Sequence, residues 1–367
     1  MRANKTVSLS VVILLITVVF AGAVIVPAAA QTDTMQFRYN AQHTGDYSPV
    51  AGPTPPNGQL KWSFTTENSV DSSPAVANGV VYVGSFDGNL YALNATTGAE
   101  VWNYTTGSSE DSSPAVANGV VYVGSDDGNF YALNANNGTQ LWNFTTGGSL
   151  ESSPAVANGV VYVGSLDNNV YAINATTGAK LWNYTTGGGG WSSPAVANGV
   201  VYVGSYDNNV YALYANNGTE LWNYTTGSEV WSSPAVANGV VYVGSEDNNV
   251  YALNATTGVK LWSFTTGSSV YSSPAVANGV VYVGSDDNNT YALNATTGAK
   301  LWNFTTGSGV FSSPAVANGT VYVGSVDGNV YAIGNAAGAT SQGIPDFDVT
   351  LALVGLVIAA YVVRRRR

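Results

Sequence analysis

A unit of 40 residues recurs seven times along this chain, and its register never slips. Every copy contains the segment Ser-Ser-Pro-Ala-Val-Ala-Asn-Gly, and a tryptophan recurs with the same period. A unit of this size cannot bury both of its faces alone, so neighbouring units must stack to form one continuous core. The recurring tryptophans are Trp62, Trp102, Trp142, Trp182, Trp222, Trp262 and Trp302.

The first copy has the pattern of four short strands joined by tight turns. β-Branched and aromatic residues alternate with small ones, and Asn78-Gly79 and Asp87-Gly88 have the chemistry of hairpin turns. The expected strands cover 72–77, 80–85, 89–95 and 101–105. Four antiparallel strands per repeat are typical of a propeller blade. The sequence therefore predicts an all-β protein, a seven-bladed β-propeller of four-stranded antiparallel blades.

The ends of the repeat array suggest how the ring closes. A tryptophan-bearing strand over 60–66 precedes the first Ser-Ser-Pro segment, and the last copy ends near Ile333 without such a strand. We expect the N-terminal strand to complete the last blade, which would remove the exposed sheet edges. The alternative is a ring of eight blades, with Met35–Tyr47 forming part of an extra blade.

The segment Ala92–Trp102 has the Ala, Gly and Trp spacing of the tryptophan-docking motif, and six copies share that spacing. It resembles the PQQ-like repeat propellers, and Phe37–Pro49 resembles the lead-in of such proteins. The resemblance covers about residues 35–338 and implies the fold, although a fold alone does not imply a function. Each recurring indole is expected to lie between adjacent blades, with its N–H bonded to a backbone carbonyl.

Outside the repeats, the two ends of the chain have the patterns of targeting segments. Arg2 and Lys5 precede an apolar run, and Pro27 leads to a small-residue cleavage site after Ala30, as in a secretory signal peptide. An uncleaved signal anchor is the alternative, because the apolar run is long enough to span a membrane. The expected segments are a signal peptide (1–30), a lead-in (31–58), the propeller (59–338), a linker with a sorting motif (339–348) and a transmembrane helix with a basic tail (349–367).

The C-terminal segment resembles the PGF-CTERM sorting signal of archaeal surface proteins. Pro345 and Phe347 flank Asp346, where that motif has glycine, and the apolar run Val349–Val363 precedes four arginines. The resemblance implies removal of this tail and transfer to a lipid anchor, and a retained membrane anchor is the alternative. Because arginines favour the cytoplasmic side, both alternatives place the propeller on the extracellular face of the cell membrane.

Charge and composition exclude several classes of site. Between Gln31 and Ser341 there are five basic and 20 acidic residues, a balance of −15, which disfavours nucleic acid as a partner. The chain has no cysteine, so disulfides and thiolate sites are excluded. Its single histidine, His43, excludes a site with several histidine ligands.

The resemblance to PQQ-like repeats raises the question of a quinone-dependent dehydrogenase. Enzymes of that family hold a quinone and calcium with one-off acidic, amide and arginine residues, whereas here the only arginine between the two ends is Arg38 and the repeats are nearly identical. The sequence therefore favours a protein that is not an enzyme and has no PQQ cofactor. Calcium stays open, because an aspartate recurs in every hairpin, although turn formation is its main interpretation. These aspartates are Asp87, Asp127, Asp167, Asp207, Asp247, Asp287 and Asp327.

The copies differ mainly at two positions, the residue three before each proline and the residue before each hairpin aspartate. The first position is acidic in three copies and aromatic in four, so an acidic arc faces an aromatic arc on one rim of the propeller. Such a rim suits a sugar, a cationic peptide or a partner protein. Neutral drift at loop tips is the alternative. The candidate rim residues are Asp71, Asp111, Glu151, Trp191, Trp231, Tyr271, Phe311, Phe86 and Tyr206.

These observations predict a cell-surface propeller that binds a protein or glycan ligand, or acts as a scaffold, through its variable rim. Two alternatives remain open. One is an envelope assembly scaffold resembling the PQQ-like propellers that help to insert outer-membrane barrel proteins, and the other is a PQQ-dependent dehydrogenase.

Overall fold

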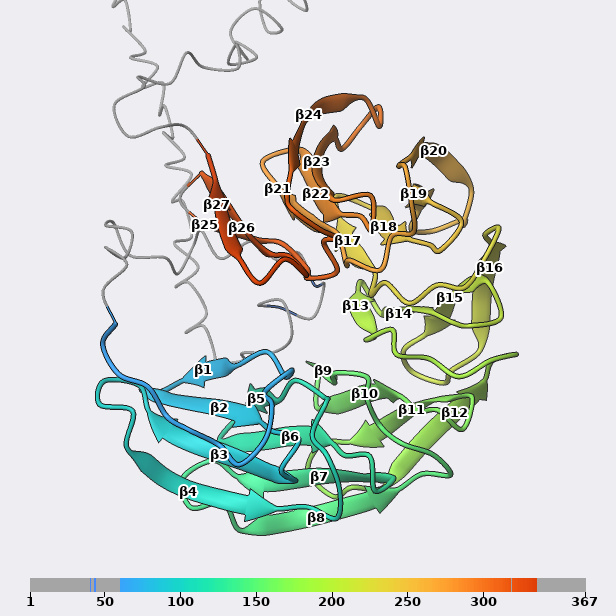
Figure 1. Cartoon of the computed structure of the whole chain (residues 1–367). Coiled ribbons are helices and arrows are strands. Elements are labelled where there is room, and N and C mark those ends of the chain that lie inside the picture. The colour runs from blue at the N-terminus through green and yellow to red at the C-terminus, as the bar shows by residue number, and fades with distance from the viewer. Residues whose placement is uncertain (1–39, 41–42, 44–59, 318, 335–367) are drawn as a thin grey trace, which may run out of the picture. The chain divides into compact units, whose positions relative to one another are not determined.

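The computed structural model describes residues 40, 43, 60–317 and 319–334. These residues form seven antiparallel sheets (Figure 1). Within these ranges there is no helix, and so none with the length and apolar content needed to cross a bilayer. The predicted signal peptide, sorting motif, C-terminal membrane segment and additional blade over Met35–Tyr47 fall outside the described residues, apart from the isolated residues 40 and 43.

Each sheet is one repeat, and we number the blades 1 to 7 in chain order. The first strands are β1 (Ala75–Ala77), β5 (Ala115–Ala117), β9 (Ala155–Ala157), β13 (Ala195–Ala197), β17 (Ala235–Ala237), β21 (Ala275–Ala277) and β25 (Ala315–Ala317). The second strands are β2 (Val80–Gly84), β6 (Val120–Gly124), β10 (Val160–Gly164), β14 (Val200–Gly204), β18 (Val240–Gly244), β22 (Val280–Gly284) and β26 (Thr320–Gly324).

The third strands are β3 (Asn89–Asn94), β7 (Asn129–Asn134), β11 (Asn169–Asn174), β15 (Asn209–Tyr214), β19 (Asn249–Asn254), β23 (Asn289–Asn294) and β27 (Val330–Ile333). The fourth strands are β4 (Glu100–Thr105), β8 (Gln140–Thr145), β12 (Lys180–Thr185), β16 (Glu220–Thr225), β20 (Lys260–Thr265) and β24 (Lys300–Thr305). The first strand is shorter than the sequence predicted, because Ser72 to Pro74 do not join the ladder, which begins at Ala75.

Neighbouring strands within a blade pair in chain order, as expected for successive hairpins. The turns use the left-handed backbone that the sequence indicated. Gly88 has a φ of 81°, and Asn168 has a φ of 70° at the same place in blade 3. Asparagine tolerates this region better than other non-glycine residues, so Asp-Gly and Asp-Asn make equivalent turns.

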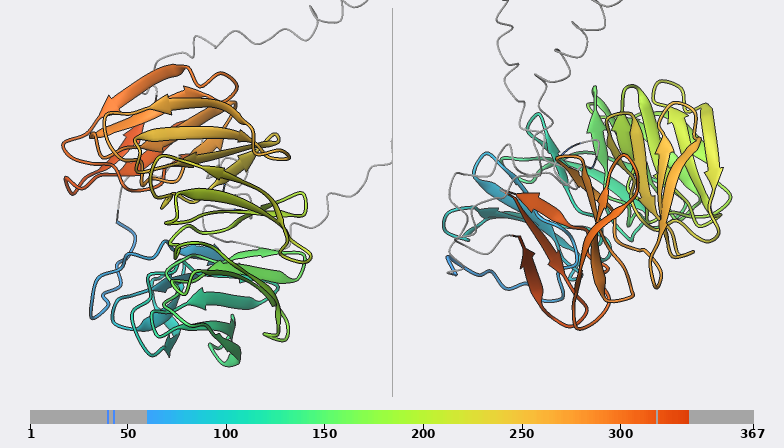
Figure 2. Two further views of the ribbon diagram at one scale, coloured as in Figure 1. Left: turned by 90° about the vertical axis from the view of Figure 1, so that its right-hand side faces the viewer. Right: turned by 90° about the horizontal axis from the view of Figure 1, so that it is seen from above.

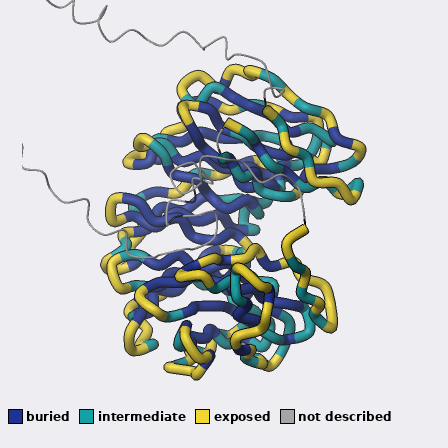
Figure 3. Tube along the Cα trace, turned by 90° about the vertical axis from the view of Figure 1, so that its left-hand side faces the viewer, coloured by how far each residue is buried: buried dark blue, intermediate teal, exposed yellow. Residues whose placement is uncertain are grey.

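Consecutive blades lie side by side, with the first strands next to one another from β1 through β25 (Figures 1 and 2). The core lies between the blades. One buried cluster, for example, joins Tyr202 and Trp222 of blade 4 to Val236 and Leu253 of blade 5. The buried segments follow the strands, whereas the exposed ones follow the turns (Figure 3). Stacking of this kind is expected of units that cannot bury both faces alone.

The recurring tryptophans dock between blades as predicted. Trp182 of blade 3 donates its Nε1–H to the carbonyl oxygen of Ala215 in blade 4, at 3.0 Å. Its ring lies on Gly218, where an added Cβ would come within 2.6 Å of the indole. The hydroxyl of Tyr162 also donates to that carbonyl, at 3.2 Å. Equivalent indole bonds of 3.0–3.1 Å are made by Trp62, Trp102, Trp142, Trp222 and Trp262.

The predicted ring closure by an N-terminal strand is wrong for the described chain. Residues 60–66 form no strand, and blade 7 has only the three strands β25, β26 and β27. Trp62 nevertheless docks on blade 1 as the other tryptophans dock on the blade that follows them. The sequence pattern thus located the docking residue correctly, but docking of the indole does not require that its backbone pair with the preceding sheet.

The junction between blade 7 and blade 1 differs accordingly from the six other junctions, and we call it the seam. Val76 on β1 is 45% exposed, whereas its equivalent Val116 on β5 is 2% exposed. Val330 on β27 is 79% exposed, although the matching residues of the other blades are buried. Among residues 60–317 and 319–334, the seam therefore lacks the interdigitated core that joins the other blades.

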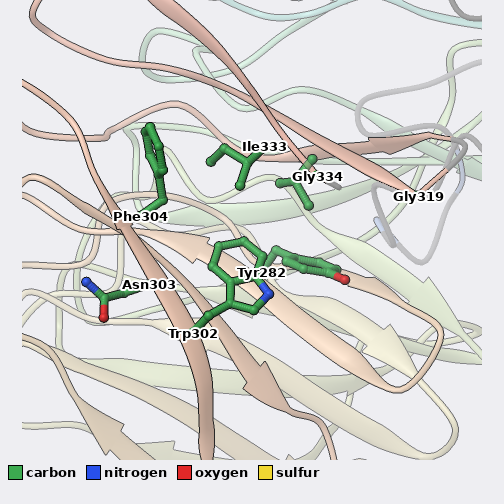
Figure 4. Close-up of a pocket in the computed structure, with 8 residues that line it drawn as sticks. Tyr282, Trp302, Asn303, Phe304, Gly319, Ile333 and Gly334 are labelled. Carbon is green, nitrogen blue, oxygen red and sulfur yellow. The ribbon is translucent and has the colours of Figure 1, made fainter. Parts of the chain in front are cut away.

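A hollow of about 380 Å³ lies at the junction of blades 6 and 7, beside Trp302 (Figure 4). Tyr282 and Trp302 line it from blade 6, and Ile333 and Gly334 line it from the end of blade 7. No charged side chain lines it. It is part of the docking layer rather than a place with evident chemistry.

Candidate functional site

A ring of serines ties the innermost ends of the blades together. In the first six Ser-Ser-Pro segments, the second serine donates its backbone N–H to the hydroxyl of the equivalent serine in the next blade. These six bonds measure 2.9–3.2 Å and run from Ser73 to Ser313. Five of these serines form the floor of a hollow of about 470 Å³. The repeated serines thus build a polar floor, which the sequence analysis treated only as strand.

The candidate rim residues gather above this floor. The same hollow is lined by residues from blades 1, 2, 3, 4, 5 and 7, which share only the central axis. The varying positions that line this hollow therefore surround the central opening of the propeller. We call this opening the mouth. The predicted residues that line its hollow are Asp71, Phe86, Asp111, Glu151, Trp191 and Phe311.

Aromatic rings form one side of the mouth, and we define the aromatic wall as Trp191, Tyr206, Trp231, Tyr271 and Phe311. Their centroids follow one another at 4.4 Å from Trp191 to Trp231, 5.5 Å from Trp231 to Tyr271 and 5.2 Å from Tyr271 to Phe311. All three pairs are edge-to-face, the arrangement that aromatic quadrupoles prefer. Tyr206 packs against Trp231 at 5.0 Å.

The aromatic wall also borders a second hollow of about 500 Å³, lined by Trp191, Trp231, Tyr271, Phe311 and Asp286. Trp191 and Phe311 line both hollows, so the two lie next to each other at the mouth. Trp191 is 42% exposed and Phe311 is 47% exposed. These rings make contact with one another and with solvent, unlike the indoles of the docking layer.

Carboxylates form the other side, and we define the acid wall as Asp71, Asp111, Asp126 and Glu151. Asp111, Asp126 and Glu151 each place a carboxylate oxygen within 4.8 Å of the others. Asp126 precedes the hairpin aspartate of blade 2, so the two varying positions of neighbouring repeats meet here. The sequence placed Asp111 and Glu151 in one arc but did not bring Asp126 to them, because that contact depends on the angle between blades.

This crowding changes the acidity of the acid wall. Burial and the charges of Asp126 and Asp71 raise the pKa of Asp111 to about 6. Burial and the charges of Asp126 and Asp111 raise the pKa of Glu151 to about 7. Burial also raises the pKa of Asp126, with a contribution from Asp127. Perturbed carboxyls in a hollow are typical of functional sites, because a ligand with positive charge would relieve the repulsion.

The two walls meet at blades 3 and 4. Glu151 and Trp191 line the same hollow, and Tyr206 lies 6.2 Å from Trp191. Burial raises the pKa of Tyr206, and Glu151 and Glu229 add to the effect. Glu229 also accepts a hydrogen bond of 2.8 Å from the indole of Trp231. The mouth thus changes from acidic to aromatic over one pair of neighbouring blades.

The hairpin aspartates form turns, as their main interpretation predicted. Asp87 accepts the backbone N–H of Asn89 at 3.0 Å and the hydroxyl of Tyr91 at 2.9 Å. Asp127 makes the same bonds and also accepts the backbone N–H of Gly107, which ends blade 1, at 2.9 Å. These carboxylates are engaged in joining strands and blades.

The mouth suits a positive ligand better than a quinone. Asp111, Asp126 and Glu151 are hard oxygen donors of the kind that calcium prefers, although calcium takes six to eight oxygens. PQQ carries several carboxylates, and among the described residues no basic side chain lines either hollow of the mouth. The residues present therefore do not fit PQQ.

A family model described as outer membrane protein assembly factor BamB matches the chain over residues 48–190, 144–230, 185–270 and 265–341. No curated protein sequence matches the chain at a significant level. Among solved structures, BamB from Moraxella catarrhalis is 24% identical with a TM-score of 0.65, and the match covers 76% of this chain and 88% of that one.

Two further solved structures share the fold. The computationally designed Ika8 protein is 20% identical with a TM-score of 0.66, over 72% of this chain and 83% of that one. A quinohemoprotein alcohol dehydrogenase from Pseudomonas putida HK5 is 16% identical with a TM-score of 0.50, over 79% of this chain and 75% of that one. At these identities the likeness indicates the fold alone.

Proposed function

Because the chain belongs to the PQQ-like repeat family, through a model described as outer membrane protein assembly factor BamB, we propose that its propeller is a non-enzymatic module that binds a partner protein through the mouth. One observation carries this proposal. The positions at which nearly identical repeats differ come together around two neighbouring hollows, with an aromatic wall and an acid wall. Grouped, partly exposed aromatic side chains are typical of interaction sites.

The place of action follows from the ends of the sequence. A signal-like N-terminus and a C-terminal apolar segment with four arginines favour display on the extracellular face of the membrane, with the C-terminal segment as the anchor. The family description also favours a second candidate function, a scaffold in the assembly of envelope proteins. The two candidates differ in the identity of the partner rather than in the surface that binds it.

Site-directed photo-crosslinking in intact cells tests the proposal. A photoreactive amino acid at Phe311 lies in the mouth, whereas the same group at Tyr214 lies at the end of β15, next to the turn that joins β15 to β16. We expect a defined protein adduct from the mouth position and none from the control. Adducts of equal yield from both positions, or from neither, would contradict the proposal. The identity of the captured partner separates the two candidates.

A further inference from the structure

The chemistry of the mouth points to a more specific ligand, an inference that rests on the proposed function. One hollow brings Asp111 and Glu151 of the acid wall together with Trp191 and Phe311 of the aromatic wall. A carboxylate cluster alone would suit any cation, and an aromatic wall alone would suit any apolar group. Only a ligand with a positive charge at one end and hydrocarbon behind it uses both walls at once.

We propose that the mouth binds a basic side chain of a partner protein, with the acid wall holding its charge and the aromatic wall covering its methylene stem. The charges fit, because within the described part of the chain no basic residue lines either hollow, and the carboxylates of Asp111, Asp126 and Glu151 converge within 4.8 Å. Lysine and arginine are the protein side chains that combine a cation with a stem of several carbons.

The aromatic wall explains why the ligand carries hydrocarbon. A hydrated divalent ion would engage the carboxylates and leave Trp191 and Trp231 unused. A methylene stem that runs from Glu151 along these rings gains apolar contact, and an ammonium or guanidinium near a ring face gains a cation–π interaction. The serine floor adds hydroxyl groups below the stem without adding charge.

The acidity of the mouth predicts how such binding depends on pH. Glu151 faces Asp111, Asp126 and the hydroxyl of Tyr206, and Asp111 faces Asp71 and Asp126. The buried carboxyl of Glu110 also interacts with the charges of Asp127 and Asp126. Protonated carboxyls attract a cation weakly, so affinity should rise as pH passes through the range of about 6 to 7 in which Asp111 and Glu151 ionise.

Fluorescence anisotropy with the purified full chain tests the inference. The probe is a dye-labelled peptide with two lysines separated by glycine, and the reference probe is the same peptide with both lysines acetylated. We expect the acetylated peptide to bind at least about tenfold more weakly, and the lysine peptide to bind more tightly at pH 8 than at pH 5.5. Equal binding of the two peptides, or affinity that is independent of pH, would overturn the inference.

Matched variants locate the binding site. Glu151→Gln and Trp191→Ala should each weaken the lysine peptide about tenfold, whereas Glu100→Gln on the outer strand β4 and Tyr214→Asn, which restores the residue of most other copies, should not. Equal losses in the mouth variants and the controls would overturn the inference. Circular dichroism and melting of each variant separate a loss of binding from a loss of fold.

Two other outcomes identify a different ligand. If calcium chloride displaces the peptide where sodium chloride of equal ionic strength does not, the acid wall is a metal site and the inference fails. If a neutral glycan competes with the labelled peptide as effectively as unlabelled lysine peptide does, recognition is by the aromatic wall alone and the inference also fails. Crosslinking at Phe311 without a preference for lysine would leave the proposed function standing and remove only this inference.

Discussion

Trp182 and Trp191 belong to the same stretch of sequence and lie in opposite surroundings. Trp182 is buried between blades, bonds the carbonyl of Ala215 and lies on Gly218. Trp191 is 42% exposed and packs on Trp231 at the mouth. A tryptophan occupies the position of Trp182 in every complete blade, whereas the position of Trp191 is an acid in three copies. In a repeat protein, then, positions that stay constant hold neighbouring units together, and positions that vary are free to carry binding.

The largest effect should come from the docking layer. Trp182→Ala removes an indole buried between two blades and leaves the Ala215 carbonyl with one bond fewer, so we expect a loss of about 3–5 kcal/mol in the free energy of unfolding. Trp191→Ala should cost about 1 kcal/mol, because it removes ring contacts that are partly exposed. Urea denaturation followed by circular dichroism measures both. Equal losses would contradict the division of roles.

Two glycines of blade 4, only one of which lies against an indole, offer a sharper test. Gly199 and Gly218 both have positive φ, but an added Cβ meets nothing within 4 Å at Gly199, whereas it lies 2.6 Å from the Trp182 ring at Gly218. Gly199→Ala should cost about 1–2 kcal/mol from backbone strain alone. Gly218→Ala should cost about 1–3 kcal/mol more, because the indole must move. Equal urea midpoints for the Gly199→Ala and Gly218→Ala variants would show that the indole does not lie on Gly218.

The seam gives the next comparison. Val116 is buried between blades 1 and 2, whereas Val76 at the equivalent place is half exposed at the seam. Val116→Ala should therefore cost about 2 kcal/mol, and Val76→Ala about half as much. The same denaturation experiment distinguishes them. Equal costs would mean that blade 7 covers Val76 in solution and that the seam is closed.

A smaller effect is expected from the acid wall, and it depends on pH. The folded-state pKa of Glu151 is about 7, above its value of about 4.3 in an unfolded chain. This group therefore favours folding at low pH, and its contribution is lost as pH rises from about 4 through 7. Glu151→Gln should remove that loss and raise the melting temperature at pH 8 but not at pH 4. The control Glu100→Gln should leave both values near wild type.

Much of this arrangement could be predicted from the sequence, because the same local sequence pattern occurs in all seven repeats. The turns, three of the four strands and the indole-to-carbonyl bonds of Trp62 and Trp102 follow from residue types and spacing. The prediction that failed concerns the end of the array: residues 60–66 do not pair with β27. The spacing of Trp62 predicts where its indole docks, but it does not determine whether its backbone joins a sheet. The tilt of each blade, which brings Asp126 to Glu151, is likewise a tertiary property that no single repeat encodes.

The most direct test combines stability and binding in one protein. The variant Trp191→Ser, Trp231→Ser, Tyr271→Ser and Phe311→Ser removes four of the five rings of the aromatic wall and leaves the docking layer intact. The account predicts a melting temperature within a few degrees of wild type, together with loss of measurable affinity for the lysine peptide. A fall of more than about ten degrees in the melting temperature would show that these rings are core, and unchanged peptide affinity would show that the mouth is not the binding site.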